Sequence, residues 1–487
     1  MWSLRGAFSV RPKINFKAFS RFAAREVSSR PAPCVGSNVE VPEGVMDSTY
    51  LKNDMKLVCE YKADSCFTAV GCFLPAGAIH EYPKERGAAL FMEHLLFRRT
   101  RCKNPEDIEE DLGKLGAKLS ATATRDIFLF YGTVPSWDFE RLMGLLAEII
   151  LDGIICEEDV EREKGVILRR LQEMEGNFEG MTMDYLPTVA YQGTNLGRSI
   201  YPDTCVIENM TADTINSFRN RLFRPHNMTM ISTGGTSFED LQCITERYFE
   251  TEEPDPCKPP KQIDQEVYPA SLSFRYTGSE MRYRDDDQEL GYVAMAVEGP
   301  GHGDCDDHCA MTVAKDFVGQ WSLADGGYKN NAPYLAQCAF GTDMCHLYKS
   351  FNIGWHCTGL WGCYFVCERM QLEDMTFMVQ KEWMRLCTSI TSKEVARAVN
   401  QCKMRELMSV KTPEDRFLDI AMCIYHRGAY QTFNERLLRF DGVSADVLRR
   451  AADKYIYDQC PVVVALGRIE NLPDYNFIRS YMYQLRR

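Results

Sequence analysis

The chain has 487 residues and a formal net charge of −13, with 45% hydrophobic and 26% charged residues. This composition excludes a mostly disordered or fibrous chain, and the length predicts two or more domains. The acidic balance argues against nonspecific nucleic-acid binding, which depends on clustered positive charge, so no nucleic-acid partner is expected. The sequence contains no run of about 18 apolar residues, and no transmembrane helix is therefore expected.

Residues 1–33 differ in composition from the rest of the chain. They carry seven basic side chains against the single acid Glu26, with serines and phenylalanines interleaved. An arginine-rich, serine-rich and acid-poor N-terminus is typical of a mitochondrial transit peptide. The alternative is a basic tail on a cytosolic protein. We expect residues 1–33 to be a transit peptide, and its removal would leave a net charge of −19.

Four apolar segments predict strands, and they form two similar pairs. Residues 68–78 and 291–301 each read as a buried strand that ends in a Gly/Pro turn, and residues 228–234 and 461–467 each end in glycine. A proline-rich, charged stretch between the pairs predicts a linker over residues 251–264. The pattern indicates a duplicated arrangement, with one domain over residues 34–250 and a second over residues 265–487.

Helical patterns lie between these strands. Residues 136–151 place their apolar side chains on one helical face, with Ser136 as the expected N-cap, and residues 374–388 and 444–456 predict further helices. Strands grouped with intervening helices predict an α+β fold in each half.

The cysteines do not predict a disulfide framework, because the chain is long and their spacing is irregular. The only run that resembles metal ligands is Cys305-Asp-Asp-His308-Cys309, which we interpret as part of a polar loop. A single run rarely supplies four ligands, so metal binding there is not expected. His302, His346, His356 and His426 show no ligand spacing.

One segment carries residues suited to catalysis. Residues 87–97 predict a buried helix with the polar pair Glu93-His94 on an otherwise apolar stretch. A hydrogen-bonded pair in the core would explain this pattern without any catalytic role.

The sequence Leu90-x-x-Glu93-His94 resembles the inverted zinc motif His-x-x-Glu-His of the pitrilysin-type metallopeptidases. In that family two histidines on one helix ligate zinc and the glutamate acts as general base. A glutamate on a second helix is the third ligand, and that helix resembles residues 161–173 here.

The resemblance is more specific to one branch of the family. The branch comprises β subunits of mitochondrial processing peptidase and core 1 subunits of respiratory complex III. The matching runs cover both halves and include residues 296–301, 358–362, 383–388, 457–461 and 472–476. The resemblance implies an α+β fold of two related halves, each a mainly antiparallel sheet with helices on one face.

The zinc ligands of the family are not retained. Leu90 stands at the first ligand position, while the base Glu93 and the second ligand His94 are kept. Alignment through Glu163 places Arg170 at the third ligand position, whereas a strict count from His94 gives Leu171. Glu173, one turn further on, could replace the third ligand only, so Leu90 would still leave the site incomplete.

We therefore interpret Glu93 and His94 as remnants of a zinc site. Arg170 would place a permanent positive charge beside a metal cation, which is repulsive. We hypothesise instead that Arg170 forms an ion pair with Glu93 and replaces the lost metal charge. The family's asparagine on the substrate-facing strand is replaced by Ser120, whereas Arg125 and Asp126 remain.

These departures favour a non-catalytic subunit over an active enzyme. Degenerate zinc motifs are expected of complex III core subunits, so the resemblance implies a matrix-side subunit of ubiquinol–cytochrome c reductase without a cofactor. Its partners would be a core protein 2-like chain and the membrane subunits of complex III.

Two alternatives remain. One is a zinc endopeptidase that pairs with the α subunit of mitochondrial processing peptidase and removes presequence peptides. The other is a non-catalytic module that binds basic presequences through acidic charge.

Overall fold

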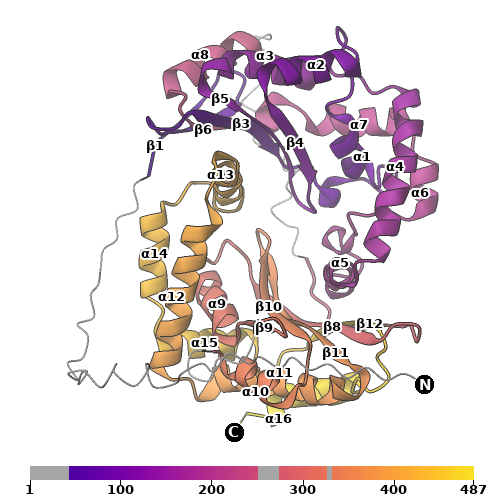
Figure 1. The fold of residues 1–487 in the computed structure, drawn as a ribbon, viewed down its shortest axis with the longest axis vertical. Coiled ribbons are helices and arrows are strands. Elements are labelled where there is room, and N and C mark those ends of the chain that lie inside the picture. The colour runs from indigo at the N-terminus through magenta and orange to yellow at the C-terminus, as the bar shows by residue number, and fades with distance from the viewer. Residues whose placement is uncertain (1–42, 250–273, 326–331, 487) are drawn as a thin grey trace, which may run out of the picture. The chain divides into compact units, whose positions relative to one another are not determined.

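Two six-stranded mixed sheets form the framework of this chain (Figure 1). The computed structural model describes residues 43–249, 274–325 and 332–486. The predicted transit peptide and the predicted linker lie outside these residues, as do the boundaries proposed for the two domains. The α+β class expected from the sequence is confirmed.

The first sheet and its helices occupy residues 45–249. The strands are β1 Val45–Tyr50, β2 Lys56–Tyr61, β3 Phe67–Leu74, β4 Lys118–Ala123, β5 Phe128–Pro135 and β6 Thr229–Gly234. The helices are α1 Ala88–Leu95, α2 Pro105–Leu115, α3 Phe139–Asp152, α4 Glu157–Glu175, α5 Phe178–Ala190, α6 Thr204–Glu208, α7 Ala212–Leu222 and α8 Phe238–Phe249.

The second sheet and its helices occupy residues 280–484. The strands are β7 Glu280–Arg284, β8 Leu290–Pro300, β9 Gln320–Ser322, β10 Leu347–Gly354, β11 Thr358–Glu368 and β12 Val462–Gly467. The helices are α9 Cys305–Val318, α10 Tyr334–Thr342, α11 Leu372–Thr388, α12 Ser392–Ser409, α13 Pro413–Arg427, α14 Phe433–Asp441, α15 Ala445–Tyr455 and α16 Tyr475–Gln484.

The two sheets share the order of five strands, β2-β6-β3-β5-β4 in the first and β7-β12-β8-β11-β10 in the second, and each carries one further edge strand, β1 or β9. The first runs β1-β2-β6-β3-β5-β4 and the second runs β7-β12-β8-β11-β10-β9. In the first sheet β6, the last strand of its half, lies between its parallel neighbour β2 and its antiparallel neighbour β3. In the second sheet β12, the last strand of its half, lies between its parallel neighbour β7 and its antiparallel neighbour β8. The remaining neighbours pair antiparallel. This shared arrangement agrees with the duplication that the four predicted strand segments indicated.

Two local predictions were wrong. Ser136 does not cap α3, because residues 136–138 form a short 3-10 turn and Asp138 precedes the helix. The Ser136 hydroxyl instead hydrogen-bonds the Thr68 hydroxyl at 2.9 Å. The run from Cys305 to Cys309 is not a loop but the first turn of α9, where two acidic residues favour the helix N-terminus.

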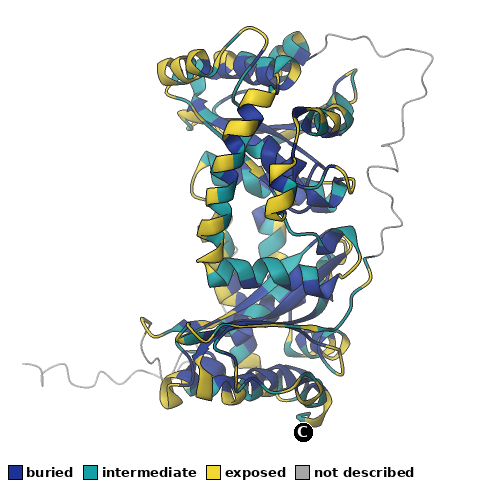
Figure 2. Ribbon diagram, turned by 90° about the vertical axis from the view of Figure 1, so that its right-hand side faces the viewer, coloured by how far each residue is buried: buried dark blue, intermediate teal, exposed yellow. Residues whose placement is uncertain are grey.

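Each sheet packs one face against the helices of its own half. In the first half, apolar residues of β3 and β5 form a core with α1, α3 and α7. In the second half, residues of β8 and β11 form a core with α9, α11 and α15, and Trp361 and Trp383 are fully buried there. The central strands of the second sheet, β8, β11 and β12, are largely buried (Figure 2). These faces supply most of the apolar burial that stabilises each half.

The opposite face of each sheet receives one helix from the other half. Helix α5 packs on β8 and β12, and helix α13 packs on β3 and β6. Tyr191, at the end of α5, is fully buried and donates its hydroxyl hydrogen to the Gly359 carbonyl at 3.0 Å. The two halves are therefore joined by an exchange of helices in which each covers part of the other sheet.

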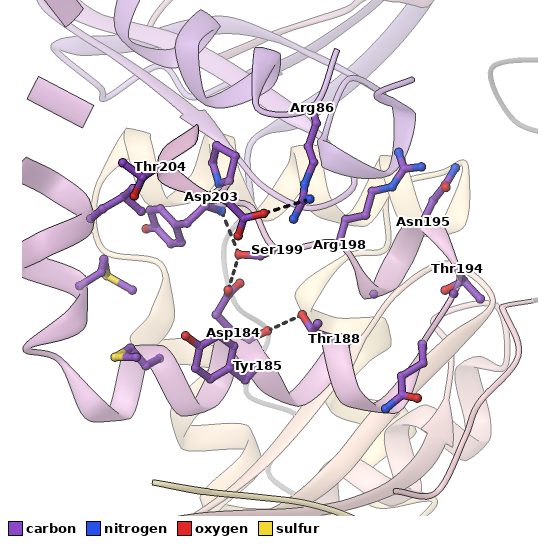
Figure 3. Close-up of a pocket in the computed structure, with 18 of the residues that line it drawn as sticks. Arg86, Asp184, Tyr185, Thr188, Thr194, Asn195, Arg198, Ser199, Asp203 and Thr204 are labelled. Carbon is purple, nitrogen blue, oxygen red and sulfur yellow. Dashed lines mark hydrogen bonds and ion pairs between the residues drawn. The ribbon is translucent and has the colours of Figure 1, made fainter. Parts of the chain in front are cut away.

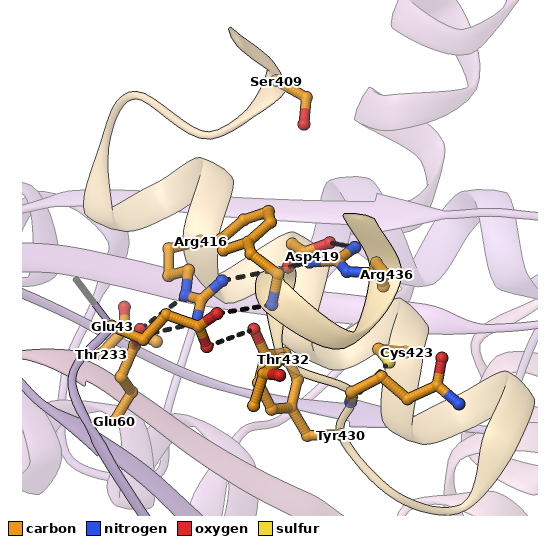
Figure 4. A network of polar contacts seen from close by, with 12 residues as sticks. Glu43, Glu60, Thr233, Ser409, Arg416, Asp419, Cys423, Tyr430, Thr432 and Arg436 are labelled. Atoms are coloured by element: carbon orange, nitrogen blue, oxygen red, sulfur yellow. Dashed lines mark hydrogen bonds and ion pairs between the residues drawn. The ribbon is translucent and has the colours of Figure 1, made fainter. Parts of the chain in front are cut away.

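A buried guanidinium holds α13 on the first sheet. Arg416 donates from Nε and Nη2 to the two carboxylate oxygens of Glu60 in β2, both at 2.7 Å (Figure 4). Both side chains are less than a tenth exposed. The guanidinium also lies over the rings of Tyr430 and Phe433. This bidentate geometry suits arginine and not lysine, because only a planar fork meets both oxygens.

The part of the chain that the structure describes contains no helix long and apolar enough to cross a membrane. The cysteines in these residues are all free thiols, as their irregular spacing predicted.

Replacing Arg416 tests the contribution of this contact. Arg416→Ala leaves the Glu60 carboxylate buried without its partner, so we expect a loss of about 3–5 kcal/mol in the free energy of unfolding. Urea denaturation of the purified full-length chain measures it. The exposed Arg450→Ala variant is the control and should change stability by less than about 0.5 kcal/mol. Adding Glu60→Leu to Arg416→Met should recover part of the loss, and an Arg416→Ala effect no larger than the control would contradict this role.

Candidate functional site

Helix α1 carries the site, and its N-terminus is fixed by a glycine and a buried acid. Gly87 has φ of 86°, and a Cβ there would lie 2.8 Å from Pro202 Cγ, so the position requires glycine. The Glu81 carboxylate accepts hydrogen bonds from the backbone N–H groups of Gly87 and Ala89, each at 2.9 Å. Burial is the main cause that raises the pKa of Glu81, to about 7.

Arg170 of α4 reaches the polar pair of α1. Its Nη1 atom donates to Glu93 Oε1 at 2.7 Å and lies 3.1 Å from His94 Nε2. The other Glu93 oxygen accepts the backbone N–H of Ala123, at the end of β4, at 2.9 Å. The Arg170 guanidinium also lies over the Tyr201 ring, 5.8 Å from its centroid. One arginine therefore contacts both residues of the retained motif.

The protonation of His94 follows from its partners. Its Nδ1 atom lies 3.3 Å from Glu163 Oε2, so the proton belongs on Nδ1 and the lone pair on Nε2 faces Arg170. Burial and then the charge of Arg170 lower the pKa of His94. For Arg170, burial opposes the charge, but the hydrogen bond with Glu93 and its negative charge raise the pKa overall. The pair is thus a carboxylate and a guanidinium, with a neutral imidazole beside them.

The neighbours in sequence do not offer replacement ligands. Leu90 is 1% exposed and packs in the core of the first half. Leu171, the alternative third position, packs against the same core. Glu173 is exposed, and no contact within the described residues joins it to Glu93 or His94. Arg170, and not Leu171, therefore occupies the position that faces the motif.

These residues do not fit a catalytic zinc ion, which needs about three protein ligands and an open position. Leu90 has no donor atom, the Nε2 lone pair of His94 faces a guanidinium, and Arg170 brings a fixed positive charge. Across residues 43–249, 274–325 and 332–486, no group of three or more His, Cys, Asp or Glu side chains is placed to hold a metal ion. The arrangement supports an ion pair and not activation of water.

The strand next to the site keeps its supporting contacts. Ser120 lies in β4, opposite Tyr131 of β5. Arg125 is 7% exposed and donates from Nη2 to Asp184 Oδ1 in α5 at 2.6 Å. Asp126 accepts the Thr124 hydroxyl at 2.8 Å and does not pair with Arg125 in the described contacts. Arg125 therefore anchors α5, the helix that covers the second sheet, and sequence reasoning assigned it no such role.

A cavity of about 930 Å³ adjoins the site between α4, α5 and the segment before α6 (Figure 3). Of its three acidic residues, Glu175, Asp184 and Asp203, the two aspartates are already engaged. Asp184 pairs with Arg125 and accepts the Ser199 hydroxyl, and Asp203 lies 3.3 Å from Arg86. The cavity therefore offers less negative charge to a basic ligand than its residue types suggest.

Two family models match the chain in tandem. Residues 56–204 match insulinase (peptidase family M16), and residues 209–402 match the peptidase M16 inactive domain. The first match contains α1 and α4, the two helices that form the site.

Curated relatives match over most of their length. Mitochondrial-processing peptidase subunit beta of Bos taurus is 36% identical over 436 residues, which cover 89% of this chain and 86% of the relative. Cytochrome b-c1 complex subunit 1, mitochondrial, of Mus musculus is 32% identical over 436 residues, which cover 90% and 89%. A chain of complex III2 from Candida albicans with Inz-5 bound shares the fold, with a TM-score of 0.77, 22% identity, and coverage of 90% and 100%.

Restoring the ligands should restore zinc binding. The Leu90→His/Arg170→Glu variant combines two histidines at i and i+4 with a carboxylate on α4, so we expect about one zinc per chain after gel filtration, measured by mass spectrometry of the metal. The unaltered chain should retain almost none. The matched control, Leu90→His/Leu171→Glu, should not bind. Equal zinc in both variants would contradict the assignment of Arg170 to the third ligand position.

The raised pKa of Glu81 predicts a pH effect on stability. The folded-state pKa of about 7 lies above the ordinary glutamate value of 4.5, so between these pH values the folded chain holds a proton that the unfolded chain has lost. Stability should therefore fall as pH rises from about 4.5 to 7, by at most on the order of 3 kcal/mol, and then stay level. Thermal unfolding of Glu81→Gln should lack this component, and a constant difference between the two proteins from pH 5 to 8 would refute it.

Proposed function

This chain belongs to peptidase family M16, and we propose that it is a non-catalytic member that serves as a matrix-side core subunit of ubiquinol–cytochrome c reductase, respiratory complex III. It would support assembly and stability of that complex and would need no zinc or other cofactor. The observation that carries the proposal is the contact of Arg170 with Glu93 and His94.

The chemistry of that contact argues against peptide hydrolysis. A general base must have a free lone pair near a bound water, and a zinc ligand must have one directed at the metal. Each oxygen of Glu93 already accepts one hydrogen bond, from the Arg170 guanidinium or the Ala123 N–H, and Leu90 and Arg170 leave no set of ligands beside it to hold a metal-bound water. Removing the guanidinium would not complete a site, because Leu90 still lacks a donor atom.

The relatives support the scaffold role in part. The match covers 89% of cytochrome b-c1 complex subunit 1 of Mus musculus, and the name of that relative makes it a subunit of the cytochrome b-c1 complex. The names of both groups of relatives describe them as mitochondrial, and this supports the mitochondrial location that we propose for this chain. By analogy, its partners would be a core protein 2-like chain and the membrane subunits of complex III.

The slightly higher identity to mitochondrial-processing peptidase subunit beta favours a second candidate. The chain would then pair with an α subunit of that peptidase and meet presequence peptides. An active zinc enzyme requires the ligands that Leu90 and Arg170 replace. A form that binds presequences without cutting them would have to attract basic peptides, although Asp184 and Asp203 of the adjoining cavity already pair with arginines.

Native electrophoresis distinguishes the two candidates. We expect this chain, followed by antibody in gently solubilised mitochondria, to migrate with cytochrome b. The Arg170→Gln variant should migrate in the same way, because the proposal assigns the site no role in assembly.

Migration apart from cytochrome b, as a soluble heterodimer with a processing α subunit, would overturn the proposal. Cleavage of a presequence by that heterodimer, lost on Glu93→Gln substitution, would establish the enzyme instead.

A further inference from the structure

A second cavity lies in the C-terminal half and has no part in the site around Glu93. It has a volume of about 250 Å³ and lies between α9, α13 and α14. Its lining includes three histidines and three arginines: His302, His308, His426, Arg427, Arg436 and Arg439. These residues come from two segments more than a hundred positions apart in the sequence.

The three imidazoles are in contact. The ring centroids of His302 and His308 are 4.2 Å apart, and those of His302 and His426 are 4.0 Å apart in a stacked arrangement. His426 is only 3% exposed, and neither of its ring nitrogens has a hydrogen-bond partner in the structure. Buried polar groups are nearly always satisfied, so a buried imidazole lining a cavity without a partner indicates a missing one.

The imidazoles are neutral and face positive charge. Burial is the main cause that lowers the pKa of His302 to about 2, that of His308 to about 4 and that of His426 to about 3. The charge of Arg427 contributes in the same direction for all three. A neutral imidazole keeps one N–H donor, which a negatively charged acceptor would satisfy.

The arginine charge in this cavity exceeds the carboxylate charge. Arg436 donates to Asp419 at 2.7 and 2.8 Å (Figure 4). It also donates to Glu406 at 2.6 Å, so one guanidinium engages both acids of the lining. Within the described residues, neither Arg427 nor Arg439 forms an ion pair. Arg427 donates to the Gln431 amide oxygen, and the buried Nη1 of Arg439 has no partner.

The alternative occupant is a metal cation, because Cys305, Cys309 and Cys423 also line the cavity. The lining carries three arginines against two acids, and this excess of positive charge opposes a cation. Burial raises the pKa of Cys309 to about 11, so its thiol stays protonated and is a poor ligand. The absence of any group of metal-ligating side chains in the described residues agrees with this exclusion.

We propose that the cavity between α9, α13 and α14 binds a small oxyanion, a phosphate or a carboxylate. The guanidinium groups of Arg427 and Arg439 supply the charge, and the unpartnered imidazole of His426 supplies a neutral hydrogen bond. Two arginines with fixed charge and a buried N–H donor form the type of setting in which oxyanions are held by charge-assisted hydrogen bonds. The site would tie the end of α13 to α14 and α9, independently of the function proposed above.

Titration calorimetry of the full-length chain with inorganic phosphate tests this proposal. Ionic strength is held constant with chloride, and succinate is titrated separately to distinguish phosphate from carboxylate. We expect saturable binding of at least one of the two anions at one site per chain. Arg439→Gln and Arg427→Gln should each weaken that binding at least about tenfold.

The matched control is Arg450→Gln, an exposed arginine of α15 outside the cavity, which should leave the affinity unchanged. Arg439 forms no ion pair within the described residues, so its variant should fold, and circular dichroism checks that it does. Absence of saturable binding for both anions, or unchanged affinity in the two cavity variants, would overturn the proposal.

Discussion

A fixed positive charge at Arg170 is the constraint on which the site depends. The Glu93 carboxylate is only 14% exposed, and a carboxylate in such a place needs a compensating charge or a proton. In a zinc enzyme the metal provides that charge. Here the guanidinium provides it, and because arginine does not lose its proton, the compensation is permanent. The same contact that satisfies Glu93 also turns a positive group towards the lone pair of His94, so the residues that survive from the motif stabilise α1 and α4 instead of holding a metal.

Arginine also pairs with an acid at the two helices through which each half covers the other's sheet. Arg125 anchors α5, which covers the second sheet, and Arg416 anchors α13, which covers the first. Each is less than a tenth exposed, and each forms a hydrogen-bonded pair with an acid. Neither pair includes Leu90, Glu93, His94 or Arg170. The contacts that join the two halves therefore do not depend on the residues of the site.

The sequence predicted the framework well because its signals are local. Buried strands ending in glycine and the helical period of residues 136–151 reappear as β3, β6, β8, β12 and α3. Alignment through Glu163 predicted that Arg170 would occupy the third ligand position and contact Glu93. A strict count from His94 placed Leu171 at that position instead. One position matters on a helix, since it turns the side chain by about 100°. The structure decides in favour of Arg170 because, of these two residues, only Arg170 contacts Glu93 and His94.

Other features had no local signal. The stacking of His302 on His426 joins the start of α9 to the end of α13, and no spacing along the chain announces it. The run beginning at Cys305 looked like a loop because it is polar and follows glycines, yet its acids favour the first turn of a helix. Ser136 looked like a cap, but a competing partner, Thr68, holds its hydroxyl. In each case a tertiary contact or the helix dipole decided the outcome.

A double-mutant cycle between Glu93 and Arg170 tests the central claim most directly. The free energy of unfolding of the full-length chain is measured for Glu93→Gln, for Arg170→Gln and for both together. If the guanidinium balances the carboxylate, the double variant should lose less stability than the two single variants combined, with a coupling of about 1 kcal/mol, since Arg170 is 36% exposed and partly screened by solvent. Losses that add to within about 0.3 kcal/mol would show that the two charges do not depend on each other and would contradict the account.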